Sequence, residues 1–250
     1  MFITQSGLTL PKVFANSVPK SGTNLLMQVI LGIPGITLTR DFYDDTILGI
    51  AGTQPGEMAY GHVAYSPQID QWLRANQIKH VFIYRDLRDV IVSMTHFIQD
   101  KFHQHPLYPY FTDQHKSWDE QILALIQGVH EDAIDYPSLY DEYRQIYDWV
   151  RIPQVCCVRY EDLVRDAESR YLTVERMTDF LFANIRWKKS QRELFINRMI
   201  QNINPSQSWT FREGKIGGWR LEFSSVHKEA FKHRTADLLI DLGYEQDNDW

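Results

Sequence analysis

The stretch "PKSGTN" (19–24) brings together a lysine, hydroxyl and amide side chains, and a glycine. It follows the apolar run "KVFANSV" (12–18) and precedes "LLMQVI", which predicts a strand, a tight turn and a helix. Such a turn points backbone N–H groups and the positive end of a helix dipole at one place, and an anion binds there. Lys20 adds a positive charge. The alternative is an ordinary helix N-cap beside an exposed lysine.

Two later segments carry further candidate anion ligands. "FIYRDLRDVIVSMTHF" places Arg85 at the end of a predicted strand and Ser93 on the helix that follows. In "FREGKIGGW", Arg212 and Lys215 lie among glycines, which predicts a flexible basic loop able to close over a second phosphate. Taken singly, Arg85 would more often be a surface ion-pair partner, and the glycine-rich stretch an ordinary surface loop.

Strands and helices must bring these segments together. Three apolar runs are expected to be buried parallel strands: 12–18, 79–85 and 154–160. Helical patterns follow at 24–33, 87–100 and 162–182, and a last one closes the chain before Gly243, a candidate C-cap. This alternation predicts an α/β fold, a three-layer sandwich with a central parallel sheet. Ligands of such folds bind at the carboxyl ends of the strands.

The composition excludes several classes of function. The chain has 250 residues, 44% hydrophobic and 23% charged, which suits a single domain over 1–250. The net charge of −6, with both signs mixed, argues against nucleic acid or a membrane as partner. The adjacent Cys156 and Cys157 predict neither a disulfide framework nor a four-ligand zinc site. Without a leader or an apolar run of roughly 18 residues, we expect a cytoplasmic protein.

The segment 99–120, "QDKFHQHPLYPYFTDQHKSW", predicts a long loop or lid. Its histidines lack cysteine support and zinc spacing, so we expect no metal. Four of its aromatic side chains are candidates for lining the pocket of an apolar or aromatic small molecule: Phe102, Tyr108, Tyr110 and Phe111. The alternative is a hydrophobic cluster that pins the loop to the core.

Three segments together resemble the sulfotransferase family, which moves a sulfuryl group from 3'-phosphoadenosine 5'-phosphosulfate (PAPS) to an acceptor. "PKSGTNLL" is similar to the family's P-K-S-G-T-[TN]-[WL] loop, "YRDLRDVIVSMTHF" to its R-[ND]-P-x-D-x-x-x-S segment, and "FREGKIGGW" to its R-K-G-x-x-G-[DE]-W loop. Their order and spacing also match, and the resemblance runs from about residue 13 to 243, which it implies is the core of the single domain. The resemblance implies the P-loop nucleoside-triphosphate-hydrolase-like sulfotransferase fold, PAPS as donor, the bisphosphate PAP as product, and a small-molecule acceptor with a hydroxyl or an amine.

The resemblance also assigns roles to residues. Lys20 and His62, the latter in "YGHVAYSPQ" and nominated as general base, would be catalytic. Tyr160, in "RYEDL", would lie beside the adenine. The three motifs supply the other cofactor-binding residues: Ser21, Gly22, Thr23, Asn24 and Leu25 with Lys20 at the 5'-phosphosulfate, Arg85 and Ser93 at the 3'-phosphate, and Arg212, Glu213 and Gly214 in the closing loop.

The sequence departs from the family's pattern at four positions. Leu25 stands where vertebrate cytosolic members have a tryptophan that stacks on adenine, and Glu213 where they have a lysine. Gly218 replaces an acidic residue and Leu87 a proline. The departures predict weaker donor binding with an intact reaction centre.

Two other functions stay open. An ATP-dependent phosphoryl transferase is weakened by the missing G-x-x-x-x-G-K-[ST], since no lysine follows Gly22, although Asp86 ends an apolar strand as a metal ligand would. A non-catalytic nucleotide-binding protein would not need His62. The motifs identify neither the acceptor, nor O- or N-sulfation, nor the oligomeric state.

Overall fold

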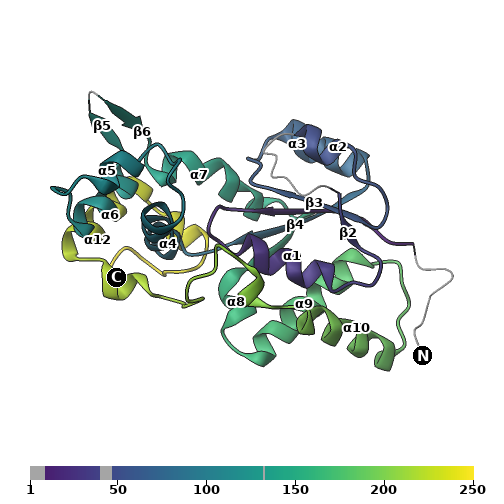
Figure 1. The fold of residues 1–250 in the computed structure, drawn as a ribbon. Coiled ribbons are helices and arrows are strands. Elements are labelled where there is room, and N and C mark those ends of the chain that lie inside the picture. The colour runs from purple at the N-terminus through teal and green to yellow at the C-terminus, as the bar shows by residue number, and fades with distance from the viewer. Residues whose placement is uncertain (1–8, 40–46, 132) are drawn as a thin grey trace.

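A five-stranded parallel sheet forms the centre of the molecule (Figure 1). The computed structural model describes residues 9–39, 47–131 and 133–250. Along the sheet the strand order is β2-β3-β1-β4-β7. The strand bounds are Thr37–Leu38 (β2), Glu57–Gly61 (β3), Lys12–Ser17 (β1), Ile78–Tyr84 (β4) and Cys156–Arg159 (β7). The predicted α/β fold with a central parallel sheet is confirmed.

Both faces of the sheet are covered, because successive residues of a strand point to opposite faces. On β1, Phe14 packs into one hydrophobic core, and Val13 and Ala15 pack into the other; on β4, Phe82 and Ile83 divide in the same way. One core is completed by α1 (Thr23–Leu31), α8 (Tyr160–Val164), α9 (Ala167–Leu181) and α10 (Lys189–Gln201). The other is completed by α3 (Pro67–Ala75), α4 (Leu87–Asp100), α6 (Trp118–Gln127), α7 (Leu139–Tyr147) and α12 (Ser225–Thr235).

The helices α4, α6 and α12 gather beyond the carboxyl ends of the strands (Figure 1). They therefore border the sheet edge at which ligands of α/β folds bind. The remaining elements are short: α2 (Ile47–Ala51), α5 (Tyr108–Thr112), α11 (Trp219–Glu222), α13 (Leu238–Asp241), the hairpin of β5 (Val129–Glu131) and β6 (Ile134–Tyr136), and 3-10 turns at Asp148–Arg151 and Pro205–Gln207.

The predicted helix at 87–100 is α4, but two other helix predictions were too long. The stretch 162–182 contains the end of α8 and then α9, because the Asp166 side chain accepts a hydrogen bond from the Ser169 N–H and starts a new helix. The last helical pattern divides into α12 and α13 at Ala236, whose φ is 47°. Gly243, with φ of 69°, donates its N–H to Ile240 O as the predicted C-cap.

We predicted a long loop or lid at 99–120, and this prediction was wrong. The segment contains all of α5 and the start of α6, which begins with a capping box in which Ser117 and Glu120 bond each other's backbone N–H groups. Strands β2 and β3 were also missed, because they are short and lack the long apolar runs of β1 and β4.

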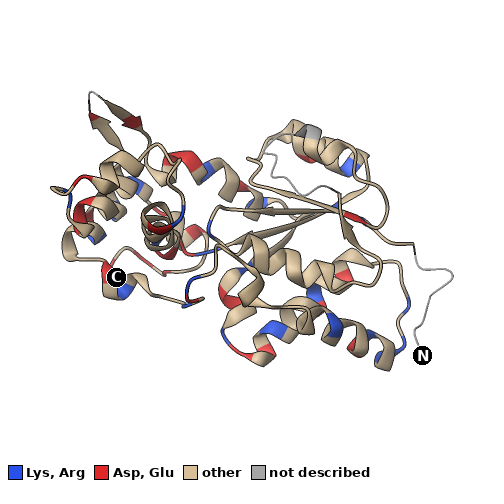
Figure 2. Cartoon of the chain, viewed as in Figure 1, with Lys and Arg blue, Asp and Glu red and all other residues tan. Residues whose placement is uncertain are grey.

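Charges of both signs are spread over the elements of the molecule (Figure 2). An anionic ligand must therefore be bound by a local group of cations rather than by one basic face. Within the described residues, no helix combines the length and the apolar character needed to cross a bilayer.

Candidate active site

The β1 loop (18–22) joins β1 to α1 at the carboxyl end of the sheet. Two of its residues have positive φ, 64° at Lys20 and 97° at Gly22. A Cβ on Gly22 would lie 2.7 Å from the Tyr160 ring, so both the backbone and the space require glycine. Ser21 is fully buried, and its Oγ has no hydrogen-bond partner among the described residues. A buried donor of this kind at a helix N-terminus is suited to an anionic oxygen.

The first turn of α1 carries three more predicted residues, Thr23, Asn24 and Leu25. The hydroxyl oxygens of Thr23 and Ser17 lie 2.8 Å apart. Asn24 Nδ2 donates a hydrogen bond to Thr210 Oγ1 at 2.9 Å. Leu25 packs at the edge of the core that α1 completes. This first turn thus links the end of β1 to the chain around Thr210.

His62 follows β3 and is held by the last residue of β1. Its Nδ1 lies 2.8 Å from Ser17 O and 2.9 Å from Ser17 Oγ. Because a carbonyl oxygen only accepts, Nδ1 carries the hydrogen and neutral His62 keeps its lone pair on Nε2. Burial lowers the pKa of His62 to about 4; the bond to Ser17 opposes this shift and the Lys20 ammonium adds to it. His62 is therefore neutral at pH 7 and able to accept a proton.

Asn16 fixes the residue next to His62. Its Nδ2 donates to Val63 O and its Oδ1 accepts from the Val63 N–H, both at 2.9 Å. Trp149 Nε1 donates to the same carbonyl at 2.8 Å. Asn16 is fully buried, so this pairing takes place away from water, where a lost hydrogen bond is costly.

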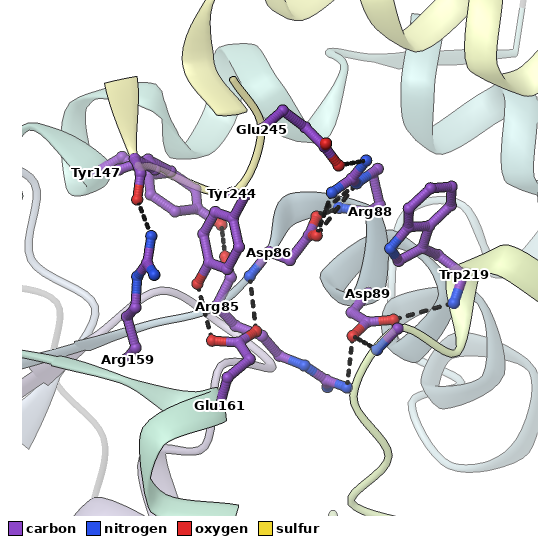
Figure 3. Close-up of polar contacts among 12 residues, drawn as sticks. Arg85, Asp86, Arg88, Asp89, Tyr147, Arg159, Glu161, Trp219, Tyr244 and Glu245 are labelled. Atoms are coloured by element: carbon purple, nitrogen blue, oxygen red, sulfur yellow. Dashed lines mark hydrogen bonds and ion pairs between the residues drawn. The ribbon is translucent and has the colours of Figure 1, made fainter. Parts of the chain in front are cut away.

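Arg85 directly follows β4, which pairs with β1 on the side opposite β3, and its guanidinium lies beside Asp89 (Figure 3). Its guanidinium carbon lies 4.5 Å from the ring centroid of Tyr160, the residue after β7. Arg85 Nη2 donates to Lys215 O at 2.6 Å and lies 3.4 Å from the Asp89 carboxylate. Its Nε is buried and has no partner among the described residues. Arg85 thus offers a donor to a ligand while its other end is held.

The closing loop (208–218) covers Tyr160 and carries the last three predicted residues. A Cβ on Gly214, where φ is 68°, would lie 3.3 Å from the Tyr160 hydroxyl. Arg212 and Glu213 are exposed. Glu213 forms an ion pair with Lys215 at 2.7 Å, and this contact lowers the pKa of the Glu213 carboxyl. The Glu213 carboxylate therefore neutralises the charge of Lys215, one of the cations of the closing loop.

One face of α4 points at the site. Asp89, Ser93 and Phe97 are spaced four residues apart and so lie along one side of the helix. Asp89 contacts the closing loop, and the Lys20 ammonium lies 3.6 Å from the centroid of the Phe97 ring. Ser93 lies between them on the same face of α4.

Lys20 lies among other cations. Burial, together with charge repulsion from Lys101, Arg85 and Arg212, lowers its pKa from 10.5 to about 7. A bound anion would reverse this repulsion and favour the ammonium form. This gathering of cations makes the region a candidate site for a multiply charged anion.

Of the four predicted acceptor residues, Phe102 is connected to this site, because its ring packs 5.6 Å from that of Phe97. Phe111 is buried in the core, and Tyr108 and Tyr110 pack against the same core. These three side chains hold α5 in place.

The side chain of Asp86, the candidate metal ligand, stabilises the start of α4. It accepts the Arg88 N–H at 2.9 Å as the N-cap and pairs with the Arg88 guanidinium at 2.6 Å. In the part of the chain that is described, there is no group of three or more His, Cys, Asp or Glu placed to hold a metal ion.

A comparison with known protein families matches residues 62–243, more than half of the chain, to the sulfotransferase domain. The chain belongs to the sulfotransferase family. Among curated relatives of this sulfotransferase, sulfotransferase 6B1 of Danio rerio is 20% identical over 226 residues, 84% of this chain and 72% of the relative. Flavonol 3-sulfotransferase of Flaveria bidentis is 21% identical over 259 residues, 95% of this chain and 75% of the relative.

Solved structures agree with the fold of the sulfotransferase. Mouse sulfotransferase SULT7A1 complexed with PAP matches with a TM-score of 0.64 at 20% identity, covering 94% of this chain and 87% of that one. Retinol dehydratase in complex with androsterone and PAP matches with a TM-score of 0.58 at 17% identity, covering 92% and 80%. Because the family match begins at His62, the role of the β1 loop rests on its own geometry.

Three residues of this site were not found from the sequence: Asn16, Ser17 and Asp89. Asn16 and Ser17 carried a usable signal, since polar residues that end an otherwise apolar strand need buried partners. Asp89 matches the aspartate of the R-[ND]-P-x-D-x-x-x-S pattern, but its contact with the closing loop depends on the fold.

Proposed function

We propose that this sulfotransferase moves the sulfuryl group of PAPS to a hydroxyl or an amine of a small cytoplasmic acceptor. The observation that carries the proposal is the meeting of Lys20, His62, Arg85 and Tyr160 at the carboxyl ends of neighbouring parallel strands. The family membership supports the reaction class, and the bisphosphate in the related complexes supports the donor.

The residues present fit a nucleotide with two separate anionic groups. The 5'-phosphosulfate would lie in the β1 loop, where the Ser21 hydroxyl and the Lys20 ammonium are available. The 3'-phosphate would lie at Arg85, with Ser93 on α4 and Arg212 on the closing loop as further ligands. The adenine would lie beside Tyr160, with Leu25 in place of an aromatic face.

Sulfuryl transfer is an in-line displacement, in which positioning and electrostatic stabilisation supply most of the rate. His62 Nε2 would take the proton of the acceptor as its oxygen or nitrogen attacks sulfur, and the Ser17 carbonyl would hold the resulting imidazolium. Lys20 would stabilise the negative charge that grows on the departing 5'-phosphate oxygen. The ring of Phe102 and its neighbour Phe97 suggest an acceptor with an apolar or aromatic body.

The test is calorimetry with PAP, ADP and ATP, first without and then with magnesium. We expect PAP to bind without magnesium and more tightly than either of the others. Arg85→Ala should remove this preference, because Arg85 recognises the 3'-phosphate. Turnover of radiolabelled PAPS with a panel of phenols, alcohols and amines then identifies the acceptor. Magnesium-dependent preference for ATP would contradict the proposal, and PAP binding without turnover on any acceptor would favour a non-catalytic binding protein.

A further inference from the structure

Asp89 joins the nucleotide side of the site to the closing loop (Figure 3). Its Oδ2 accepts the Gly217 N–H at 2.8 Å, and its Oδ1 accepts the Trp219 N–H at 3.0 Å. The same carboxylate lies 3.4 Å from Arg85 Nη2. Asp89 is 3% exposed, so these contacts are made with almost no competing water.

The loop end that Asp89 holds is fixed from a second side. The Trp219 ring lies 3.9 Å from the guanidinium carbon of Arg88, the residue before Asp89 on α4. Arg88 is itself 1% exposed and pairs with Asp86 and Glu245, each at 2.6 Å. Trp219 is therefore attached to α4 through both its backbone and its ring.

The chain just before Trp219 is attached differently. Gly217 has φ of 70°, a conformation that leaves this point of the backbone to glycine. Upstream, Phe211 and Ile216 are 42% and 45% exposed, and the Lys215 carbonyl accepts from Arg85. The carboxylate of Asp89 thus stands between a fixed end, Trp219, and an exposed stretch that reaches Arg85.

We propose that Asp89 is a positioning residue that sets the selectivity for a 3'-phosphate by holding Arg85 and the closing loop in one arrangement. This inference rests on the proposed function. Asp89 does not touch the nucleotide; it orients the guanidinium of Arg85 and fixes the two loop N–H groups, so that binding of the 3'-phosphate and closure of residues 208–218 occur together.

Asp89→Asn tests the inference with little change of shape. The amide keeps one acceptor oxygen, but its NH2 faces a backbone N–H and it loses the ion pair with Arg85. We expect PAP affinity to fall about 10- to 100-fold, the loss typical of a charge-assisted hydrogen bond, while affinity for AMP, which lacks the 3'-phosphate, changes less than about threefold. Asp100→Asn is the matched control, because it removes the same charge from an exposed position of α4.

The double variant Arg85→Ala/Asp89→Asn separates positioning from general support of the fold. If Asp89 acts through Arg85, adding Asp89→Asn to Arg85→Ala changes PAP affinity less than about twofold. Equal losses for PAP and AMP, or losses that add in the double variant, would overturn the inference. If the unsubstituted chain does not bind PAP, the proposed function is overturned instead.

Two measurements report on the loop itself. Trypsin cleaves after Arg212 and Lys215, both exposed, and PAP should protect these sites in the unsubstituted chain but not in Asp89→Asn. If Asp89→Asn fails to fold, amide hydrogen exchange on the unsubstituted chain remains decisive. The Gly217 and Trp219 amides should be protected from exchange before PAP is added. Exchange at the rate of free amides would overturn the inference that Asp89 holds the closing loop.

Discussion

The β1 loop and the closing loop lie on two sides of the same site but are built differently. The β1 loop is short, has Val18 and Ser21 fully buried, and is shaped by positive φ at Lys20 and Gly22. The closing loop is exposed and is held from outside, through Asp89, Arg85 and Asn24. In the proposed function, the first loop is already in place at the reacting sulfuryl group, whereas the second is arranged by its contacts around the 3'-phosphate.

This difference predicts where substitutions act. Changes in the β1 loop or at His62 should reduce turnover, because no other side chain can take over the positions of these groups. Changes in the closing loop should alter affinity by smaller amounts, because several weak contacts share the work. The predictions below test that distinction in order of decreasing effect.

The largest effect is expected from His62→Ala. Without a base at the end of β3, turnover should fall by about 10²- to 10⁴-fold, the usual contribution of general acid–base catalysis. PAP affinity, measured by calorimetry, should stay within about threefold. His103→Ala, at an exposed position, is the control. Parallel loss of PAP affinity would place His62 in binding instead.

Gly22→Ala should break the β1 loop. The new Cβ meets the Tyr160 ring at 2.7 Å and the backbone holds φ of 97°, a combination that costs about 1–3 kcal/mol where a side chain must adopt it. Thermal melting and PAP affinity should both fall. At Gly52 an added Cβ meets nothing within 4 Å, so Gly52→Ala serves as the control. Unchanged PAP affinity in Gly22→Ala would show that the loop adapts as readily as the closing loop.

Lys20 should make PAP binding depend on pH. Its pKa is lowered to about 7 without ligand, and an anion beside it raises that pKa. Binding therefore takes up a proton above pH 7, and affinity should decline as the pH rises from 7 to 9. Calorimetry at pH 8 in buffers of different ionisation enthalpy measures the uptake. Lys20→Met should abolish it; uptake that persists in this variant would point to another group.

The smallest effect is expected at Glu213. Replacement by lysine removes the ion pair that occupies Lys215, and PAP affinity should rise by less than about fivefold, as for an exposed charge pair. The gain should shrink in high salt. A gain larger than tenfold would mean that the closing loop is as tightly coupled to the nucleotide as the β1 loop.

The sequence predicted the parts of this site that depend on local structure. The β1 loop, Arg85 and α4 follow from apolar runs with polar ends, which alone indicate a strand, a turn and a helix. It did not predict how distant segments meet. Residues 89 and 217 are brought together by the whole fold, and the pairing of Asn16 with Val63 depends on β3, a strand too short to be seen in the pattern.

Trp209 lies in the closing loop, is 65% exposed, and packs 5.3 Å from Phe97. Lys101 donates to its backbone carbonyl at 2.5 Å. When the loop closes, this indole would exchange water for the side chains around Lys20, and its fluorescence would shift to shorter wavelength. The difference in fluorescence emission between the unsubstituted chain and Trp209→Phe therefore reports loop closure. Rapid-mixing fluorescence can measure its rate on the microsecond-to-millisecond scale of lid motions.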